Sequence, residues 1–162
     1  MLYAAPAAET IGLTLPMDGS SILTFSMGNL PTSRGSVTLA STNPADQPLI
    51  DPNYYATEVD KHVMREAYRM QTRLLLDTPE GRDLVEGEHI PPGFTSEELG
   101  VGASDGAIDR RVGLGGSTTF HPSGTAAMGS VVDGGLVVKG VKGLRVVDAS
   151  VVSIWMGAVL LR

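Results

Sequence analysis

Apolar side chains recur every three or four residues through the middle of the chain, which is typical of an amphipathic helix. They are Val59, Val63, Ala67, Met70 and Leu74. Thr57, with Asp60 three residues later, carries the signal of a helix start. The pattern predicts a helix that runs from Thr57 to about Leu76 and turns this apolar face toward the core.

Three shorter helical signals follow the long one. Thr78 is a helix cap with Pro79 in the first turn. Thr95 or Ser96 caps the next short helix, and glycines interrupt it before a further helix at 105–112. The chain from 57 to 112 is therefore predicted to be mainly helical.

Strand signals lie on both sides of this helical stretch. Residues 36–40 alternate, with Val37 and Leu39 predicted to point inward, and residues 22–27 read as an earlier strand. Residues 49–52 form a short extended piece. Beyond the helices, residues 135–138 and 144–147 indicate two short strands separated by a turn-rich segment.

Composition narrows the class of protein. A chain of 162 residues can bury a core of its own, and the absence of cysteine excludes disulfides and thiolate chemistry. The net charge of −6 argues against a nucleic-acid partner. No apolar run reaches the length of about 20 residues that a membrane helix needs. Residues 1–16 lack the basic start of a secretory signal, so the default expectation is the cytoplasm.

The candidate chemistry centres on His121, which Pro122 and the small residues 123–127 follow directly. Small residues allow a ligand to approach the backbone closely, so the pattern places a titratable ring beside a glycine-lined pocket. The residues alone leave open whether His121 is structural or acts as an acid or base. His62 fits a surface or core-edge position and His89 a loop, and no ligand spacing predicts a metal site.

The segment from His121 resembles the C-terminal signature of the glucose-methanol-choline (GMC) oxidoreductases, which are FAD-dependent alcohol oxidases and dehydrogenases. The matching pieces are His121-Pro-Ser-Gly-Thr-Ala-Ala-Met-Gly129, Val132-Asp133 and Gly143-Leu-Arg-Val-Val-Asp-Ala-Ser-Val151. A second match, Pro31 to Leu39, resembles the strand with which this family enters its substrate domain. Together the matches span most of the chain.

The resemblance implies an α+β fold: an antiparallel sheet with helices packed on one face, as in a GMC substrate domain, plus a glycine-rich C-terminal segment of the flavin domain. On this basis we predict three parts. They are an N-terminal arm with the first strand at 1–29, a substrate-domain-like α+β region at 30–116, and a flavin-facing catalytic segment with an atypical, truncated tail at 117–162.

The resemblance also implies a cofactor and its site. FAD would accept the hydride, His121 would accept the hydroxyl proton, and five residues would contact the flavin. These are Gly124, Thr125, Asp148, Ala149 and Ser150. The expected substrate is a small-molecule alcohol or a polyketide-like compound of secondary metabolism.

Three features depart from the family pattern. No G-x-G-x-x-G motif follows an N-terminal strand, so most of the FAD site is missing from these residues and a partner chain, or self-association, is expected to supply it. Val159 stands where the family has a second catalytic His or Asn. The match stops at Val151, and our hypothesis is that residues 152–162 are intron read-through and Met1 an internal start; the alternative is a real apolar tail that packs on the sheet.

These departures keep two alternatives to alcohol oxidation open. One is a non-redox cyclase, lyase or isomerase that reuses the pocket with His121 as a lone acid or base. The other is an inactive remnant that serves as an interaction module, because the surface that faces the cofactor would expose apolar side chains.

Overall fold

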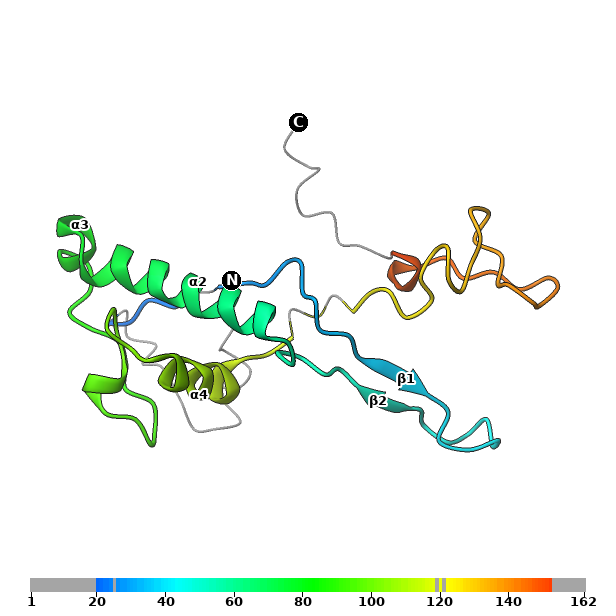
Figure 1. Ribbon diagram of the computed structural model, residues 1–162, viewed down its shortest axis with the longest axis horizontal. Coiled ribbons are helices and arrows are strands. Elements are labelled where there is room, and N and C mark those ends of the chain that lie inside the picture. The colour runs from blue at the N-terminus through cyan, green and yellow to red at the C-terminus, as the bar shows by residue number, and fades with distance from the viewer. Residues whose placement is uncertain (1–19, 25, 119, 121, 153–162) are drawn as a thin grey trace. The chain divides into compact units, whose positions relative to one another are not determined.

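The computed structural model describes residues 20–24, 26–118, 120 and 122–152. The chain forms two compact units. The helical unit comprises the described residues of 1–28 and 57–119, and the second unit those of 29–56 and 120–162. Figure 1 shows the helices of the first unit and the strand pair of the second. The predicted division into three parts stays a prediction.

The long central helix, α2 (Glu58–Leu76), begins and ends where the sequence predicts. The Thr57 hydroxyl accepts a hydrogen bond from the backbone N–H of Asp60 at 3.2 Å, which satisfies a donor that the first turn leaves unpaired. Thr78 does the same for Gly81 at 3.0 Å and starts α3 (Pro79–Arg82). Both cap predictions are confirmed.

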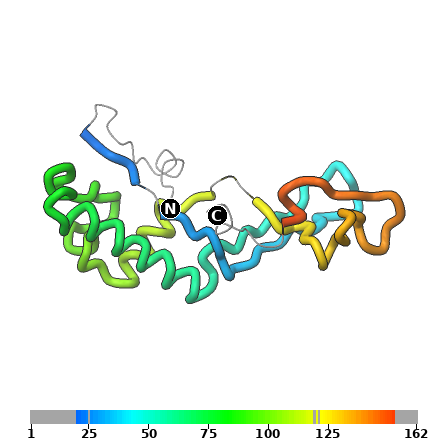
Figure 2. Tube along the Cα trace, turned by 90° about the horizontal axis from the view of Figure 1, so that it is seen from above, coloured from blue at the N-terminus to red at the C-terminus, as the bar shows by residue number. Residues whose placement is uncertain are grey.

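The face of α2 that is buried differs from the prediction. Val59, Val63, Met70 and Leu74 are 56, 48, 72 and 63% exposed, whereas Met64 and Thr72 on the other side are buried. The reason lies in the neighbouring helix: α4 (Asp105–Gly115) packs on α2 (Figure 2). Arg65 and Arg69 of α2 bind acidic side chains of α4. Hydrophobic periodicity identifies an apolar face, but it does not identify which element lies against the helix.

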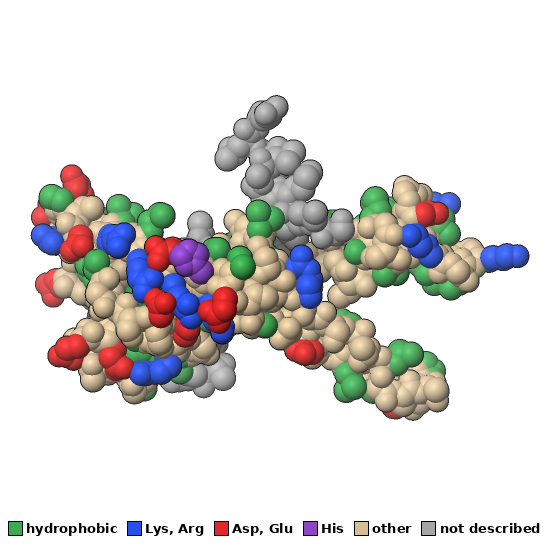
Figure 3. Space-filling model, viewed as in Figure 1, with side chains coloured by type: hydrophobic (Ala, Val, Ile, Leu, Met, Phe, Trp, Pro, Cys, Tyr) green, Lys and Arg blue, Asp and Glu red, His purple; other side chains and the backbone are tan. Residues whose placement is uncertain are grey.

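Ion pairs hold α4 against α2. Arg65 donates two hydrogen bonds to Asp109, from Nε at 2.8 Å and from Nη2 at 2.5 Å. Arg69 pairs with Asp105, and this pairing holds the pKa of that carboxyl below its ordinary value. Figure 3 shows acidic and basic side chains interleaved over these helices. The two-pronged geometry of Arg65 matches a carboxylate and sets how the helices align.

The core of the helical unit is small and centres on α4. Ile108 is 1% exposed, and the other buried apolar side chains of this unit come from both helices and the loop between them. These are Met64, Leu99, Ala103, Ala107 and Val112. Helix α4 starts at Asp105 as predicted and extends to Gly115, three residues beyond the predicted end. Before it, Ser96–Glu98 form a single 3₁₀ turn in which the backbone N–H of Thr95 donates to the Glu98 carboxylate at 3.0 Å.

Strands β1 (Ser36–Thr38) and β2 (Leu49–Asp51) form an antiparallel pair, with Val37 opposite Ile50. The α+β class with an antiparallel sheet is therefore confirmed. The prediction that Val37 and Leu39 point inward is wrong, because these side chains are 49 and 85% exposed. The pair has no buried face among the described residues, so alternation alone could not have shown which side is covered.

The start of the hairpin is closely packed around Gly35. A Cβ atom at Gly35 would lie 2.2 Å from the carbonyl oxygen of Asp51, so only glycine fits there. The Asn53 amide donates to the carbonyl of Arg34 at 2.9 Å. The Ser33 hydroxyl accepts from the N–H of Ala56 at 2.9 Å. The Ser33-Arg34-Gly35 motif thus fixes where the two strands of the hairpin meet.

The strand predicted at 22–27 does not form among the described residues 22–24, 26 and 27. The Ser26 hydroxyl instead donates to the Gln71 side chain of α2 at 2.9 Å. A strand needs a neighbouring ladder of backbone groups, and this segment lies along a helix, which offers none. In the part of the chain that the structure describes, no helix combines the length and the apolar character needed to cross a membrane.

Candidate functional site

The two sequence motifs that begin at His121 and end at Val151 lie against each other. The backbone N–H of Ala126 donates to the carbonyl of Ser150 at 2.9 Å, and that of Met128 donates to the carbonyl of Val151 at 2.9 Å. We call residues 122–152 the glycine-rich segment. Its two ends, more than 20 residues apart in sequence, form one continuous surface of backbone and short side chains.

Gly124 and Thr125 lie on this surface. Gly124 has a φ of +86°, and a Cβ atom there would come within 3.3 Å of the carbonyl oxygen of Val152. Glycine relieves both the backbone strain and the crowding. Thr125 is exposed, while Ala126 and Ala127 are partly buried. The local sequence therefore lets two stretches of backbone approach each other closely and leaves Thr125 exposed.

Asp148 caps the turn that brings the second motif into place. Its Oδ1 accepts hydrogen bonds from the Ser150 hydroxyl at 2.5 Å and from the Ser150 N–H at 2.8 Å. These bonds, the hydroxyl first, lower the pKa of the Asp148 carboxyl. The capped 3₁₀ turn Ala149–Val151 presents the two carbonyls that bind Ala126 and Met128. Within this chain, Asp148 and Ser150 position the backbone.

The region between the motifs is a set of tight turns around one buried side chain. Val132 is fully buried, and the Asp133 carboxylate accepts from the N–H groups of Gly135 and Val137 at 2.8 and 3.0 Å, which lowers its pKa. The strands predicted at 135–138 and 144–147 do pair antiparallel, but only through one isolated bridge, that of Val137 with Arg145. The intervening turn leaves too few residues for a regular ladder.

His121, the predicted catalytic residue, lies outside the described residues, so its role stays a prediction. Its neighbour Phe120 is 67% exposed and has a φ of +61°. A positive φ is unusual for a bulky side chain and occurs where the chain must turn sharply. His62 and His89 are exposed, His62 on α2 and His89 in a loop, in agreement with the surface and loop positions predicted for them.

A polar cluster in the helical unit was not predicted. The Tyr68 hydroxyl donates to Glu88 at 2.5 Å and accepts from the N–H of Gly100 at 3.0 Å. Arg111 donates from Nε to the other oxygen of Glu88 at 3.2 Å. Burial, then the bond to Glu88, raises the pKa of Tyr68. The partners are 20 or more residues apart, so no local pattern reveals the cluster.

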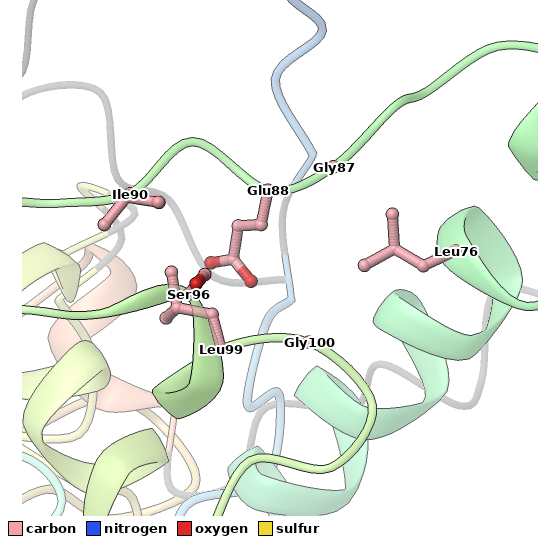
Figure 4. Close-up of a pocket in the computed structure, with 7 residues that line it drawn as sticks. All are labelled: Leu76, Gly87, Glu88, Ile90, Ser96, Leu99 and Gly100. Carbon is pink, nitrogen blue, oxygen red and sulfur yellow. The ribbon is translucent and has the colours of Figure 1, made fainter.

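A cavity of about 250 Å³ lies next to this cluster (Figure 4). Its walls are mainly apolar, with one carboxylate and one hydroxyl. The lining residues are Leu76, Gly87, Glu88, Ile90, Ser96, Leu99 and Gly100. Both carboxylate oxygens of Glu88 already accept hydrogen bonds, from Tyr68 and Arg111. The carboxylate therefore fixes its loop to α2 and α4. None of the predicted site residues that the structure describes lines this cavity.

The comparison with known families decides the assignment. The model of the GMC oxidoreductase C-terminal region, described as "GMC oxidoreductase", matches residues 31–158. The chain belongs to the GMC oxidoreductase family. The match includes both motifs of the glycine-rich segment and the hairpin, so the resemblance seen in the sequence is confirmed.

Among its GMC relatives is the GMC-type oxidoreductase acuG of Aspergillus aculeatus, 45% identical over 94% of this chain and 29% of the relative. An oxygen-dependent choline dehydrogenase of Vibrio vulnificus is 36% identical over 90% of this chain and 26% of that protein. A solved structure of the formate oxidase of Aspergillus oryzae, from work on its FAD modification, is 37% identical. It has a TM-score of 0.61 over 75% of this chain and 21% of that chain. The chain thus spans less than a third of the length of these relatives.

The glycine-rich segment fits the FAD that the GMC assignment implies. The side chains at 123–127 are short, as a flat ring that approaches the backbone would require, whereas the space at Gly124 itself is taken by the Val152 carbonyl. Thr125 offers an exposed hydroxyl. Among the described residues no group of three or more His, Asp or Glu side chains could hold a metal ion.

Proposed function

We propose that this chain supplies the proton-transfer side of an FAD-dependent GMC oxidoreductase that oxidises a CH–OH group. The observation that carries the proposal is the pair of hydrogen bonds from Ala126 and Met128 to the carbonyls of Ser150 and Val151. These bonds join the two motifs, the first of which follows His121 directly in the sequence. The similarity to an alcohol dehydrogenase of Pseudomonas putida, 38% identical over 75% of this chain, supports an alcohol as substrate.

Oxidation of an alcohol to a carbonyl removes a hydride from carbon and a proton from oxygen. Bound FAD supplies the hydride acceptor, which no amino-acid side chain can provide. In this proposal the imidazole of His121 accepts the hydroxyl proton as the hydride leaves, because histidine is the side chain that most often serves as a general base. The protonated imidazole then accounts for the hydroxyl hydrogen and the hydride acceptor for the hydrogen on carbon, which leaves the carbonyl product.

The remaining predicted residues hold the cofactor in this proposal. Gly124 and Thr125 would contact the ring, the first through its backbone and the second through its hydroxyl. Asp148, Ala149 and Ser150 would act through backbone, since the Asp148 carboxylate is committed to the cap at Ser150. The nucleotide part of FAD would be held by polypeptide outside the matched region, either a partner chain or a second copy of this one.

The test uses the purified chain together with the part of acuG that lies outside the match. The mixture is supplied with FAD and a panel of primary alcohols, and flavin reduction is followed by absorbance. We expect His121→Asn to slow reduction by roughly 100-fold or more, the usual contribution of a general base. The matched control is His89→Asn, an exposed loop histidine that should leave the rate unchanged.

Two results would contradict the proposal. Equal rates for His121→Asn and the wild type would remove His121 from the proton transfer. Turnover of a substrate in FAD-free samples, abolished by the same substitution, would instead indicate a non-redox acid–base enzyme.

A further inference from the structure

The cavity beside Glu88 has a size and a lining that suit a small molecule. It measures about 250 Å³ and lies between Leu76, the last residue of α2, and the loop that joins α3 to α4. Figure 4 shows the Leu76 side chain extending from α2 toward the Glu88 carboxylate. An engineered apolar cavity of about 150 Å³ holds benzene, so this one has room for roughly ten non-hydrogen atoms.

Two adjacent arginines of α4 hold the loop that forms most of the cavity wall. Arg110 lies over the ring of Phe94, 4.4 Å from its centroid, and pairs with Glu98 at 2.7 Å. Arg111 pairs with Glu88 at 3.2 Å, and both of these side chains are less than one-fifth exposed. The cavity is therefore formed before a ligand arrives, which lowers the entropic cost of binding.

The polar cluster next to the cavity has hydrogen-bonding capacity that the described residues do not use. A carboxylate has about four acceptor sites, and in the described part of the chain Glu88 accepts only from Tyr68 and Arg111. Among the described residues, Nη1 of Arg111 is buried without a hydrogen-bond partner. Because buried donors are nearly always paired, the cluster lacks one acceptor. A group that both donates and accepts would complete it.

We propose that this cavity binds a small neutral alcohol with an apolar body. The body lies against the three apolar side chains of the wall, Leu76, Ile90 and Leu99, and the hydroxyl donates to Glu88 and accepts from Arg111.

The alcohol class follows from the hydrogen bonds and the charge. An ammonium group only donates and a carboxylate only accepts, whereas a hydroxyl does both. The charge of Glu88 is already paired with that of Arg111, which favours a neutral ligand. All the lining residues belong to the helical unit, and none is predicted to contact the flavin. The inference therefore does not rest on the proposed function.

The experiment titrates the purified chain, without FAD, with benzyl alcohol, toluene, benzylammonium and benzoate. Methyl resonances of Leu76, Ile90 and Leu99 report on the cavity, and those of Ile22, an exposed residue outside it, are the reference. We expect benzyl alcohol to shift the cavity methyl resonances saturably. The other three compounds should bind roughly five-fold or more weakly, because toluene lacks donor and acceptor, benzylammonium the acceptor and benzoate the donor.

Two substitutions fill the cavity. Leu99→Trp enlarges a buried side chain of the wall, and Ile90→Trp enlarges a half-exposed one. Each should weaken the binding of benzyl alcohol by roughly ten-fold or more, because the indole takes the space of the ligand. The matched control, Ile22→Trp, should leave the affinity unchanged. Far-UV circular dichroism identifies the folded variants, so Ile90→Trp keeps the test decisive if Leu99→Trp does not fold.

Three results would each overturn the inference. The first is the absence of saturable shifts at the cavity methyl groups. The second is binding of toluene, benzylammonium or benzoate as tight as that of benzyl alcohol, and the third is wild-type affinity in a folded cavity-filling variant. Because neither FAD nor turnover enters the measurement, failure of the proton transfer proposed for His121 leaves it unaffected. The two proposals can therefore fail separately.

Discussion

The helical unit and the glycine-rich segment are held together in different ways. In the helical unit, side-chain contacts predominate: Ile108 is buried, and Arg65 donates two hydrogen bonds to Asp109. In the glycine-rich segment, backbone groups bind one another, and Val132 is its one fully buried side chain among the described residues. A surface made of short side chains buries little apolar area, so its stability has to come mainly from backbone hydrogen bonds.

The largest expected effect tests the side-chain half of this comparison. Ile108→Ala should lower the free energy of unfolding by about 3 kcal/mol, since it removes a buried side chain and leaves a cavity. Urea unfolding followed by far-UV circular dichroism measures it. Ile22→Ala is the control, because Ile22 is more than half exposed. Equal losses for both would mean that the helical unit has no specific core at α4.

The next effect tests the ion pair between the helices. Asp109→Asn should cost about 2 kcal/mol, because it takes the charge from two hydrogen bonds of a mostly buried arginine. Asp77→Asn is the matched control, since Asp77 pairs with Arg82 in solvent and such pairs contribute less than about 1 kcal/mol. The same urea experiment compares them, and equal costs would argue against the role given to Arg65.

Substitution of glycine by alanine should change the free energy of unfolding in opposite directions in the two regions. Gly113→Ala lies in α4 with open space around it and should stabilise the protein by roughly 0.5–1 kcal/mol. Gly129→Ala also meets open space, but its φ of +89° should make it destabilising by roughly 1 kcal/mol.

Native-state hydrogen exchange can follow the two regions separately. Gly134→Ala is the control within the glycine-rich segment, because Gly134 has open space and no positive φ. Stabilisation by Gly129→Ala would show that the turn at 129 is not fixed in the left-handed region.

The smallest expected effect is the dependence of stability on acidic pH. Ser150 lowers the pKa of Asp148 below its ordinary value of 3.8, so the charged carboxylate stabilises the folded segment. That contribution is present above pH 3.8 and is lost as the pH falls through the lower, folded-state pKa. Nuclear magnetic resonance of the carboxyl carbon should show a midpoint below 3.8, and Ser150→Ala should move it upward. An unchanged midpoint in Ser150→Ala would show that the hydroxyl is not the cause.

The comparison also explains what could be predicted from the sequence. The caps at Thr57 and Thr78 were predictable because a cap binds a backbone group three residues away. The buried face of α2 was not, because Arg65 finds its partner 44 residues further along the chain. The same holds for Tyr68 and Glu88, which meet only after the helices pack.

At the candidate site, the family motifs predicted the structure better than hydrophobic periodicity did. The pairing of the Gly124 and Asp148 regions follows the family signature, and the structure brings them together. The strands expected at 135–138 and 144–147 shrink to single bridges, because valine-rich alternation does not reveal how many backbone partners are in reach. The role proposed for His121 stays a prediction, because His121 lies outside the described residues.

The two hydrogen bonds that join Ala126 to Ser150 and Met128 to Val151 close a loop at its base and leave the turn at Val141 and Lys142 exposed. Closure entropy grows slowly with length, by about 0.6 kcal/mol for each doubling of the loop. The tip can therefore accept inserted residues while the base keeps its shape. Evolution could vary the length of this turn, and an engineer could place a reporter peptide there, without disturbing the hydrogen bonds at its base.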